Sequence, residues 1–235
     1  VDCFIEAIQA SPVEVTVSGP YGEPVQAIYG RKGACAIIEM AAAAGLPMVG
    51  QRKNPGETTT YGVGQLIAHA IEHGCREILL GLGGSATNDG GCGCAAALGV
   101  KFYDQLGNEF VPVGLTQIHK IDCSSAQQRL QGMHITVMCD VDNPLYGSTG
   151  AAYIFAPQKG ADENMVTLLD EGLKKMDIAI QASLNRSVAE LPGAGAAGGM
   201  GGGCVAFLGA ELKSGIECVL DTVGFDAILR GADLV

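Results

Sequence analysis

The stretch REILLGLGGSATNDGGCGCAAALG, residues 76–99, contains a complete strand–loop–helix unit. Its first part, REILLGL (76–82), is a short apolar run typical of a buried strand, and NDGGCGCAAALG (88–99) predicts a helix of small residues. The glycine-rich loop between them directs backbone N–H groups and the positive end of a helix toward one point, which suits an anion. Asp89 is the single charged side chain of this loop. The unit therefore predicts an anion site that carries an acid and no lysine.

Strands alternate with helices on both sides of this unit. The predicted strands are 13–19 and 25–30, which form a hairpin, then 100–104, 134–141 and the first part of 34–45. The predicted helices are 58–74, 162–181 with Asp162 as N-cap, and the last parts of 34–45 and 192–210. No internal repeat or obvious linker interrupts them, and 235 residues are enough for one large domain or two small ones. The pattern predicts the α/β fold class, with a mixed or largely parallel sheet flanked by helices.

Composition narrows the classes of function. The chain is 48% hydrophobic and 17% charged, as in a globular protein, and its net charge of −11 argues against nucleic-acid and acidic-membrane partners. Its apolar runs stop short of the roughly 20 residues that span a bilayer. The nine cysteines are an odd number and are interpreted as free thiols in a reducing cytoplasm. His69 and His73 lie four residues apart but lack the H-E-x-x-H pattern, so they do not predict a metal site.

Spacing alone also allows a dinucleotide site. GLGGSA (81–86) satisfies G-x-G-x-x-A after a strand, and Asp104 lies at the end of the next predicted strand, where a ribose-binding acid is expected. This predicts an NAD-type oxidoreductase built on Gly81, Gly83, Ala86 and Asp104. Against it, an aspartate beside a phosphate is repulsive unless it binds a cation or works as a base. A plain tight turn between strand and helix is a further interpretation of the same residues.

Other polar stretches fit phosphoryl transfer. Asp140 and Asp142 follow a buried strand in CDVDNPLYG (139–147) and carry the oxygen ligands that Mg²⁺ prefers, although an Asx-Pro turn would use the same residues. Lys159 in FAPQKGA (155–161) is a candidate cation for a phosphate or carboxylate, or a simple solvated lysine. The threonines of NPGETTTYGVGQLI (54–67) precede a helix and suit an anion or a helix cap. A second glycine loop, 193–203, contains another G-x-G-x-x-G.

Five motifs in register resemble the bacterial glycerate kinase family: NPGETTTYGVGQLI, GLGGSATNDGG, CDVDNPLYG, FAPQKGA and PGAGAAGGMGGG. The resemblance covers essentially the whole chain. It implies phosphorylation of D-glycerate by ATP with Mg²⁺, most simply to 2-phosphoglycerate. It also implies a two-domain α/β protein in which a second domain is inserted into a flavodoxin-like one.

The resemblance implies roles for individual residues. In this hypothesis Asp89 accepts the proton of the substrate hydroxyl or holds Mg²⁺, and Asn88 orients it. Lys159 binds a phosphate and completes the catalytic group, and Asp140 and Asp142 hold the metal. The residues expected to bind substrate or nucleotide are Gly83, Gly84, Ser85, Thr58, Thr59, Thr60, Gly195, Gly198 and Gly199. The expected partners are glycerate, ATP and a second copy of the chain in a homodimer.

The sequence begins inside one predicted element and stops inside another. VDCFIEAIQA (1–10) predicts a helix already under way and ILRGADLV (228–235) the start of a core strand. With the resemblance, this predicts that the chain is the inserted domain, without most of its flavodoxin-like partner. The alternative to an active kinase is then a binding domain that does not turn over by itself.

Overall fold

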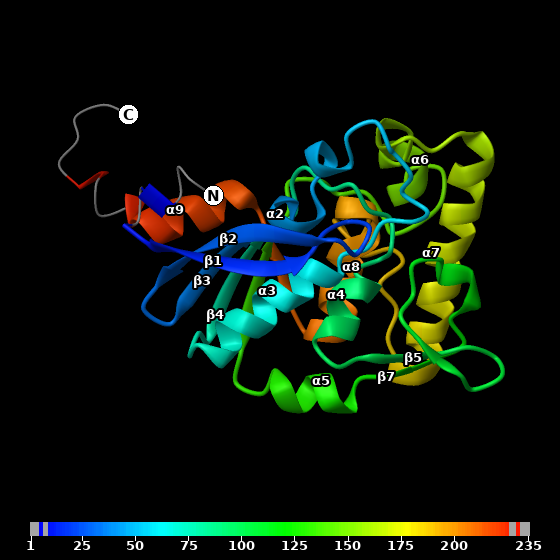
Figure 1. The fold of residues 1–235 in the computed structure, drawn as a ribbon, viewed down its shortest axis with the longest axis horizontal. Coiled ribbons are helices and arrows are strands. Elements are labelled where there is room, and N and C mark those ends of the chain that lie inside the picture. Colours follow the sequence, from blue (N-terminus) through cyan, green and yellow to red (C-terminus); the bar gives the residue numbers. More distant parts are fainter. Residues whose placement is uncertain (1–4, 7–8, 226–228, 231–235) are drawn as a thin grey trace.

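A six-stranded sheet forms the centre of the computed structural model, which describes residues 5–6, 9–225 and 229–230 (Figure 1). The predictions for 1–10 and 228–235 fall largely outside these residues. The strand order is β1-β2-β3-β4-β8-β9, with bounds Ser11–Ser18, Pro24–Lys32, Cys35–Glu39, Glu77–Gly81, His134–Met138 and Glu211–Lys213. β3, β4, β8 and β9 run parallel, while β1 and β2 form an antiparallel hairpin at one edge. The predicted mixed, largely parallel sheet is confirmed.

The central strands alternate between a buried and a half-buried face. Ile78 and Leu80 of β4 are buried and pair in register with Ile135 and Val137 of β8, which are buried as well. Because side chains alternate along a strand, these four residues share one face of the sheet and anchor the core there. The apolar run 76–82 therefore forms a strand, as predicted.

Helices cover the sheet. Their bounds are α2 Ala41–Ala44, α3 Tyr61–Glu72, α4 Cys92–Ala97, α5 Ser124–Arg129, α6 Ala151–Phe155, α7 Glu163–Leu184, α8 Ala196–Leu208 and α9 Gly215–Val223, with 3₁₀ turns η1 Leu46–Val49, η2 Leu115–Gln117 and η3 Pro157–Lys159. α3 packs on β1, β3 and α4, whereas α8 packs on β8, β9 and α4 (Figure 1). α7 carries the predicted N-cap, because the Asp162 side chain accepts from Met165 N at 2.8 Å. Among the described residues, no helix is long and apolar enough to cross a membrane.

A second, smaller sheet lies beside α7. Its antiparallel strands are β6 (Glu109–Phe110), β5 (Lys101–Tyr103) and β7 (Lys120–Asp122), in the order β6-β5-β7. The predicted strand 100–104 therefore exists, but it does not join the main sheet. This matters for Asp104, which a dinucleotide site would need beside the glycine loop.

The parallel strands end at the same level. Glu39 at the end of β3 pairs with Gly81 at the end of β4, and Gly81 pairs with Met138 at the end of β8. The loops that follow these three strands consequently leave the sheet side by side. In open α/β sheets, ligands bind at this carboxyl edge.

Candidate functional site

The glycine loop after β4 is held to the segment that follows β3. Ala86 N donates to Ala44 O at 2.9 Å, and Leu46 N donates to Gly84 O at 2.8 Å. Gly84 has a φ of +73°, a conformation that glycine adopts without strain. These bonds leave Gly83 and Gly84 exposed at the carboxyl edge of the sheet.

Asp89 points away from this exposed tip and is completely buried. Its Oδ2 atom accepts from Thr60 N at 2.7 Å, Thr60 Oγ1 at 2.8 Å, Thr59 Oγ1 at 3.4 Å and Gly93 N at 3.2 Å. Its Oδ1 atom accepts from Gly91 N at 3.1 Å. Thr60 Oγ1 in turn accepts from Cys94 N at 2.9 Å, so the Thr60 hydroxyl proton is free to point at the carboxylate.

These contacts place the Asp89 carboxylate at the start of both α3 and α4. Thr60 is the N-cap of α3, and Gly91 and Gly93 flank the first residue of α4. Burial raises the pKa of the Asp89 carboxyl, and the donors from Thr60, Gly91 and Gly93 oppose that shift. The anion site that the sequence predicts at this helix end is thus filled by the acid of the loop itself.

The second glycine loop packs against the first one. Ala197, Gly198 and Gly199 have left-handed backbone angles inside α8. A Cβ on Gly198 would lie 2.1 Å from Thr87 O, and Gly90 N donates to Gly198 O at 3.1 Å. The glycines of this loop therefore allow its backbone to pack closely against the backbone of the first glycine loop.

Lys159 lies on the other side of the first loop and is only 2% exposed. Its Nζ donates to Ser85 Oγ and to Thr87 O, both at 2.6 Å. Among the described residues, no carboxylate lies within ion-pair distance of this amine. Burial lowers the pKa of the Lys159 amine to about 7, and the more distant Asp89 charge opposes that shift.

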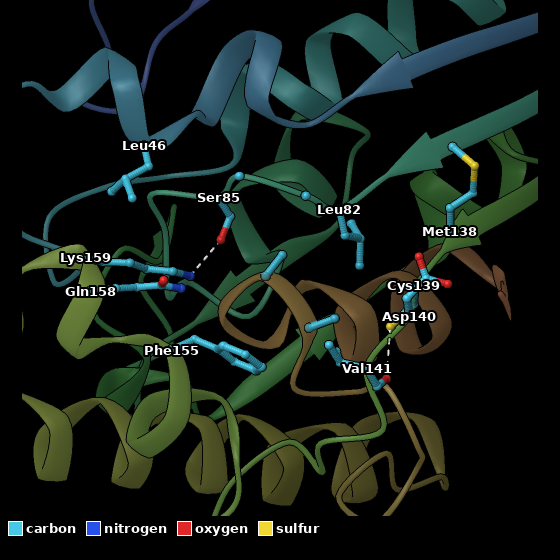
Figure 2. A pocket seen from close by; sticks show the side chains of 14 residues that line it. Leu46, Leu82, Ser85, Met138, Cys139, Asp140, Val141, Phe155, Gln158 and Lys159 are labelled. Carbon is cyan, nitrogen blue, oxygen red and sulfur yellow. Dashed lines mark hydrogen bonds between the residues drawn. The ribbon is translucent and has the colours of Figure 1, made fainter. Parts of the chain in front are cut away.

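A cavity of about 380 Å³ opens at the carboxyl edge of the sheet. It is lined by residues 82–85 after β4, residues 138–141 at the end of β8 and beyond it, and Leu46, Phe155, Gln158, Lys159, Ala196 and Ala197. Figure 2 shows Lys159 and Ser85 pointing toward each other at one side, with Cys139 and Asp140 across the cavity. The volume lies within the range of small-molecule sites.

The structure brings five predicted site residues together around this cavity: Gly83, Gly84, Ser85, Asp140 and Lys159. The predicted residues that do not line it are Thr58, Thr59, Thr60, Asn88, Asp89, Asp142, Gly195, Gly198 and Gly199. Thr58 Oγ1 donates to Ala86 O at 2.8 Å and so holds the loop from behind. In the described part of the chain, neither amide atom of the buried Asn88 side chain has a hydrogen-bond partner, so the structure shows no bond by which it would orient Asp89.

Asp140 and Asp142 are both exposed. Asp140 Oδ1 accepts from Gly215 N at 2.8 Å and from Ser214 Oγ at 3.2 Å, so it caps the start of α9. The described residues contain no group of three His, Cys, Asp or Glu side chains that is placed to hold a metal ion. These aspartates therefore fit a Mg²⁺ ion only together with phosphate oxygens and waters.

Several cavity residues were missed by the sequence reasoning. Leu46, Phe155 and Ala197 are apolar and carry no chemical signature, and they reach the cavity through turns whose direction the sequence does not reveal. Ala197 has a φ of +54°, which is uncommon for a residue with a Cβ, and it lies within a run of glycines. The glycine-rich run is the sequence feature that indicates a site here, but it predicts the glycines as binding residues and not the alanine between them.

The dinucleotide interpretation is not supported. Asp104 is half-buried in a turn of the small sheet, where its carboxylate accepts from Leu106 N at 2.8 Å and Asn108 N at 2.9 Å. It lines a different cavity, against α7, and not the one at the glycine loop. A ribose held by the glycine loop would not meet this acid.

Comparisons with known proteins agree with the motifs. The model of the glycerate kinase family matches residues 1–235. The chain is 48% identical to glycerate kinase of Bacillus cereus and 46% identical to glycerate 2-kinase of Escherichia coli K12, over all of this chain and 63% of each relative. A crystal structure of a Salmonella typhimurium LT2 protein, provisionally described as glycerate kinase 2, superposes with a TM-score of 0.96 at 45% identity, over all of this chain and 64% of that one.

The chain thus spans about 63% of the length of the curated relatives it matches. The match nevertheless includes every residue of the chain, both glycine loops and the cavity between them. The chain belongs to the glycerate kinase family.

Proposed function

We propose that the complete protein transfers the γ-phosphoryl group of ATP to a hydroxyl of D-glycerate. The observation that carries the proposal is the cavity at the carboxyl edge of the sheet, where exposed glycine backbone faces a buried lysine. Phosphoryl transfer requires positioning and charge compensation more than covalent chemistry. Gly83 and Gly84 let an anionic group approach the backbone, and the Lys159 amine lies beside them at the cavity.

Mg²⁺ would neutralise charge on the phosphates of ATP when bound. Asp140 lines the cavity and Asp142 follows it in the same loop, so these residues would face a Mg²⁺ ion that arrives with the nucleotide. Asp89 has a different proposed role from the one in the sequence hypothesis. Its five hydrogen bonds make it the group that holds the glycine loop to α3 and α4.

The name of the Escherichia coli relative, glycerate 2-kinase, supports 2-phosphoglycerate as the product. We place the reaction in the cytoplasm, because the described cysteines are free thiols, as expected in a reducing compartment. Two expectations stay predictions: residues 1–235 as the inserted domain of a two-domain protein, and a homodimer.

The test is a coupled ADP-release assay with D-glycerate, ATP and Mg²⁺ on the complete protein and on residues 1–235 alone. We expect turnover of the complete protein on the order of 1–100 s⁻¹. Phosphorus NMR of the product distinguishes 2-phosphoglycerate from 3-phosphoglycerate. No glycerate-dependent ADP release from the complete protein would contradict the proposal, whereas release from the complete protein alone would identify residues 1–235 as a binding domain that needs a partner.

A further inference from the structure

The proposed reaction requires a group that accepts the proton of the glycerate hydroxyl, and Asp89 is badly placed for it. The Asp89 carboxylate is fully buried, does not line the cavity and already accepts five hydrogen bonds. A proton acceptor has to reach the reacting hydroxyl directly or through one intervening group. Another acceptor is therefore needed, and the described residues that line the cavity include a candidate.

Ser85 and Lys159 provide the required contact. Ser85 Oγ lies at the cavity wall, 2.6 Å from Lys159 Nζ, which is 2% exposed. Thr87 O accepts from the same Nζ at 2.6 Å and fixes the direction of the amine. In its neutral form the amine donates one N–H to Thr87 O and turns its lone pair to Ser85. A lysine that accepts the proton of an adjacent serine hydroxyl is a known arrangement.

We propose that Ser85 and Lys159 act as a proton-accepting pair, in which Ser85 Oγ takes the proton of the glycerate hydroxyl while it passes its own proton to Lys159 Nζ. This inference rests on the proposed kinase function. The glycerate oxygen forms a bond to the γ-phosphorus, and the bond from that phosphorus to the bridging oxygen breaks with its electron pair remaining on ADP. Ser85 is neutral before and after the step, and Lys159 becomes an ammonium beside the transferred phosphoryl group. The ammonium returns its proton to water when the product leaves.

The surroundings of Lys159 agree with this assignment. Burial lowers the pKa of its amine to about 7, so the neutral form is populated near neutral pH. Asp89, behind the glycine loop, is the charged group that raises this pKa. Asp140 lies across the cavity and is bonded to Gly215, while α8 contributes only Ala196 and Ala197 to the lining.

The test compares Ser85→Ala, Lys159→Arg and Lys159→Ala in the complete protein, with Lys174→Arg, exposed on α7, as matched control. Arginine keeps the positive charge but cannot lose its proton. We expect kcat/KM to fall by about 10²–10⁴-fold in Lys159→Arg and by at least about 10²-fold in Ser85→Ala, the usual scale of general-base help, with thermal unfolding used to confirm that both variants fold. The acidic limb of the wild-type kcat/KM profile, near pH 7, should be absent from Lys159→Arg.

Chemical rescue separates the proton acceptor from a simple cation. Added methylamine or ethylamine should restore part of the Lys159→Ala activity, in proportion to the concentration of the free base. Rescue that follows the ammonium form, an active Lys159→Arg variant, or a Ser85→Ala variant with normal kcat would each overturn the inference while the kinase function stands. A wild-type protein that releases no ADP with D-glycerate would overturn the proposed function, and this inference with it.

Discussion

Two charged side chains are buried on opposite sides of one glycine loop, and their surroundings differ completely. The Asp89 carboxylate accepts five hydrogen bonds from backbone and threonine donors and does not line the cavity. Lys159 has two acceptors, Ser85 Oγ and Thr87 O, no carboxylate partner among the described residues, and a place in the cavity lining. Burying a charged group is costly unless hydrogen bonds or an opposite charge compensate for it. The five donors compensate the Asp89 carboxylate, so its role is structural. The Lys159 amine has only two acceptors in the described part of the chain and can still interact with a ligand in the cavity.

The largest effect on stability should come from Asp89→Asn. The amide has nearly the same shape, but its NH₂ group would face the Gly91 N–H while the remaining oxygen keeps the donors of Thr60 and Gly93. We expect the free energy of unfolding to fall by about 3 kcal/mol, measured by urea denaturation. The folded fraction of the complete protein should keep kcat within about tenfold of wild type. Normal stability with a 10²-fold loss of kcat would instead make Asp89 the proton acceptor.

A glycine pair tests whether the second loop supports the first by close packing. Gly198 and Gly209 have φ values of +69° and +66°, but a Cβ on Gly198 would lie 2.1 Å from Thr87 O, whereas a Cβ on Gly209 meets nothing within 4 Å. Gly209→Ala should cost about 1 kcal/mol through its backbone angle alone. Gly198→Ala should cost about 2 kcal/mol more, because Thr87 and the loop have to move. Equal losses, measured by thermal unfolding, would show that the two backbones do not need this contact.

The pH dependence of the free energy of unfolding measures the shifted pKa of the Lys159 amine. Burial lowers the pKa of the amine to about 7 in the folded protein, whereas in the unfolded chain the pKa is close to the ordinary lysine value of 10.5. Between these values the unfolded state binds more protons, so this group makes the free energy of unfolding rise with pH. Relative to Lys159→Met, the wild type should gain about 2 kcal/mol between about pH 7 and pH 9. A difference that stays constant over this window would show that the amine titrates normally.

The smallest effect should come from Asp104→Asn. This residue is half-buried and lies in a turn away from the glycine loop. We expect a small change in Tm, from the loss of the turn hydrogen bonds, and no change in ADP release by the complete protein. Protection from heat by NAD(H) that is lost in Asp104→Asn would revive the dinucleotide interpretation.

The sequence predicted the sheet well because its strands and helices carry local signals. The apolar run 76–82, the hairpin at 13–30 and the Asp162 cap all formed as the patterns indicate. The cavity was predicted only in part, since five of its lining residues were predicted as site residues and its apolar lining was not. The direction of a side chain within a loop depends on tertiary packing. No local pattern distinguishes Asp89, which points into the protein, from Ser85, which points at the cavity.

The most direct test of the contrast between the two buried charges is the titration of Lys159 itself. In residues 1–235 carrying ¹³Cε-labelled lysine, the resonance that is missing from Lys159→Met can be followed by NMR as the pH is raised. The desolvated amine at the cavity should titrate near pH 7, well before the exposed lysines. A midpoint above about pH 10 would contradict the account, because Lys159 would then be an ordinary solvated or fully compensated cation.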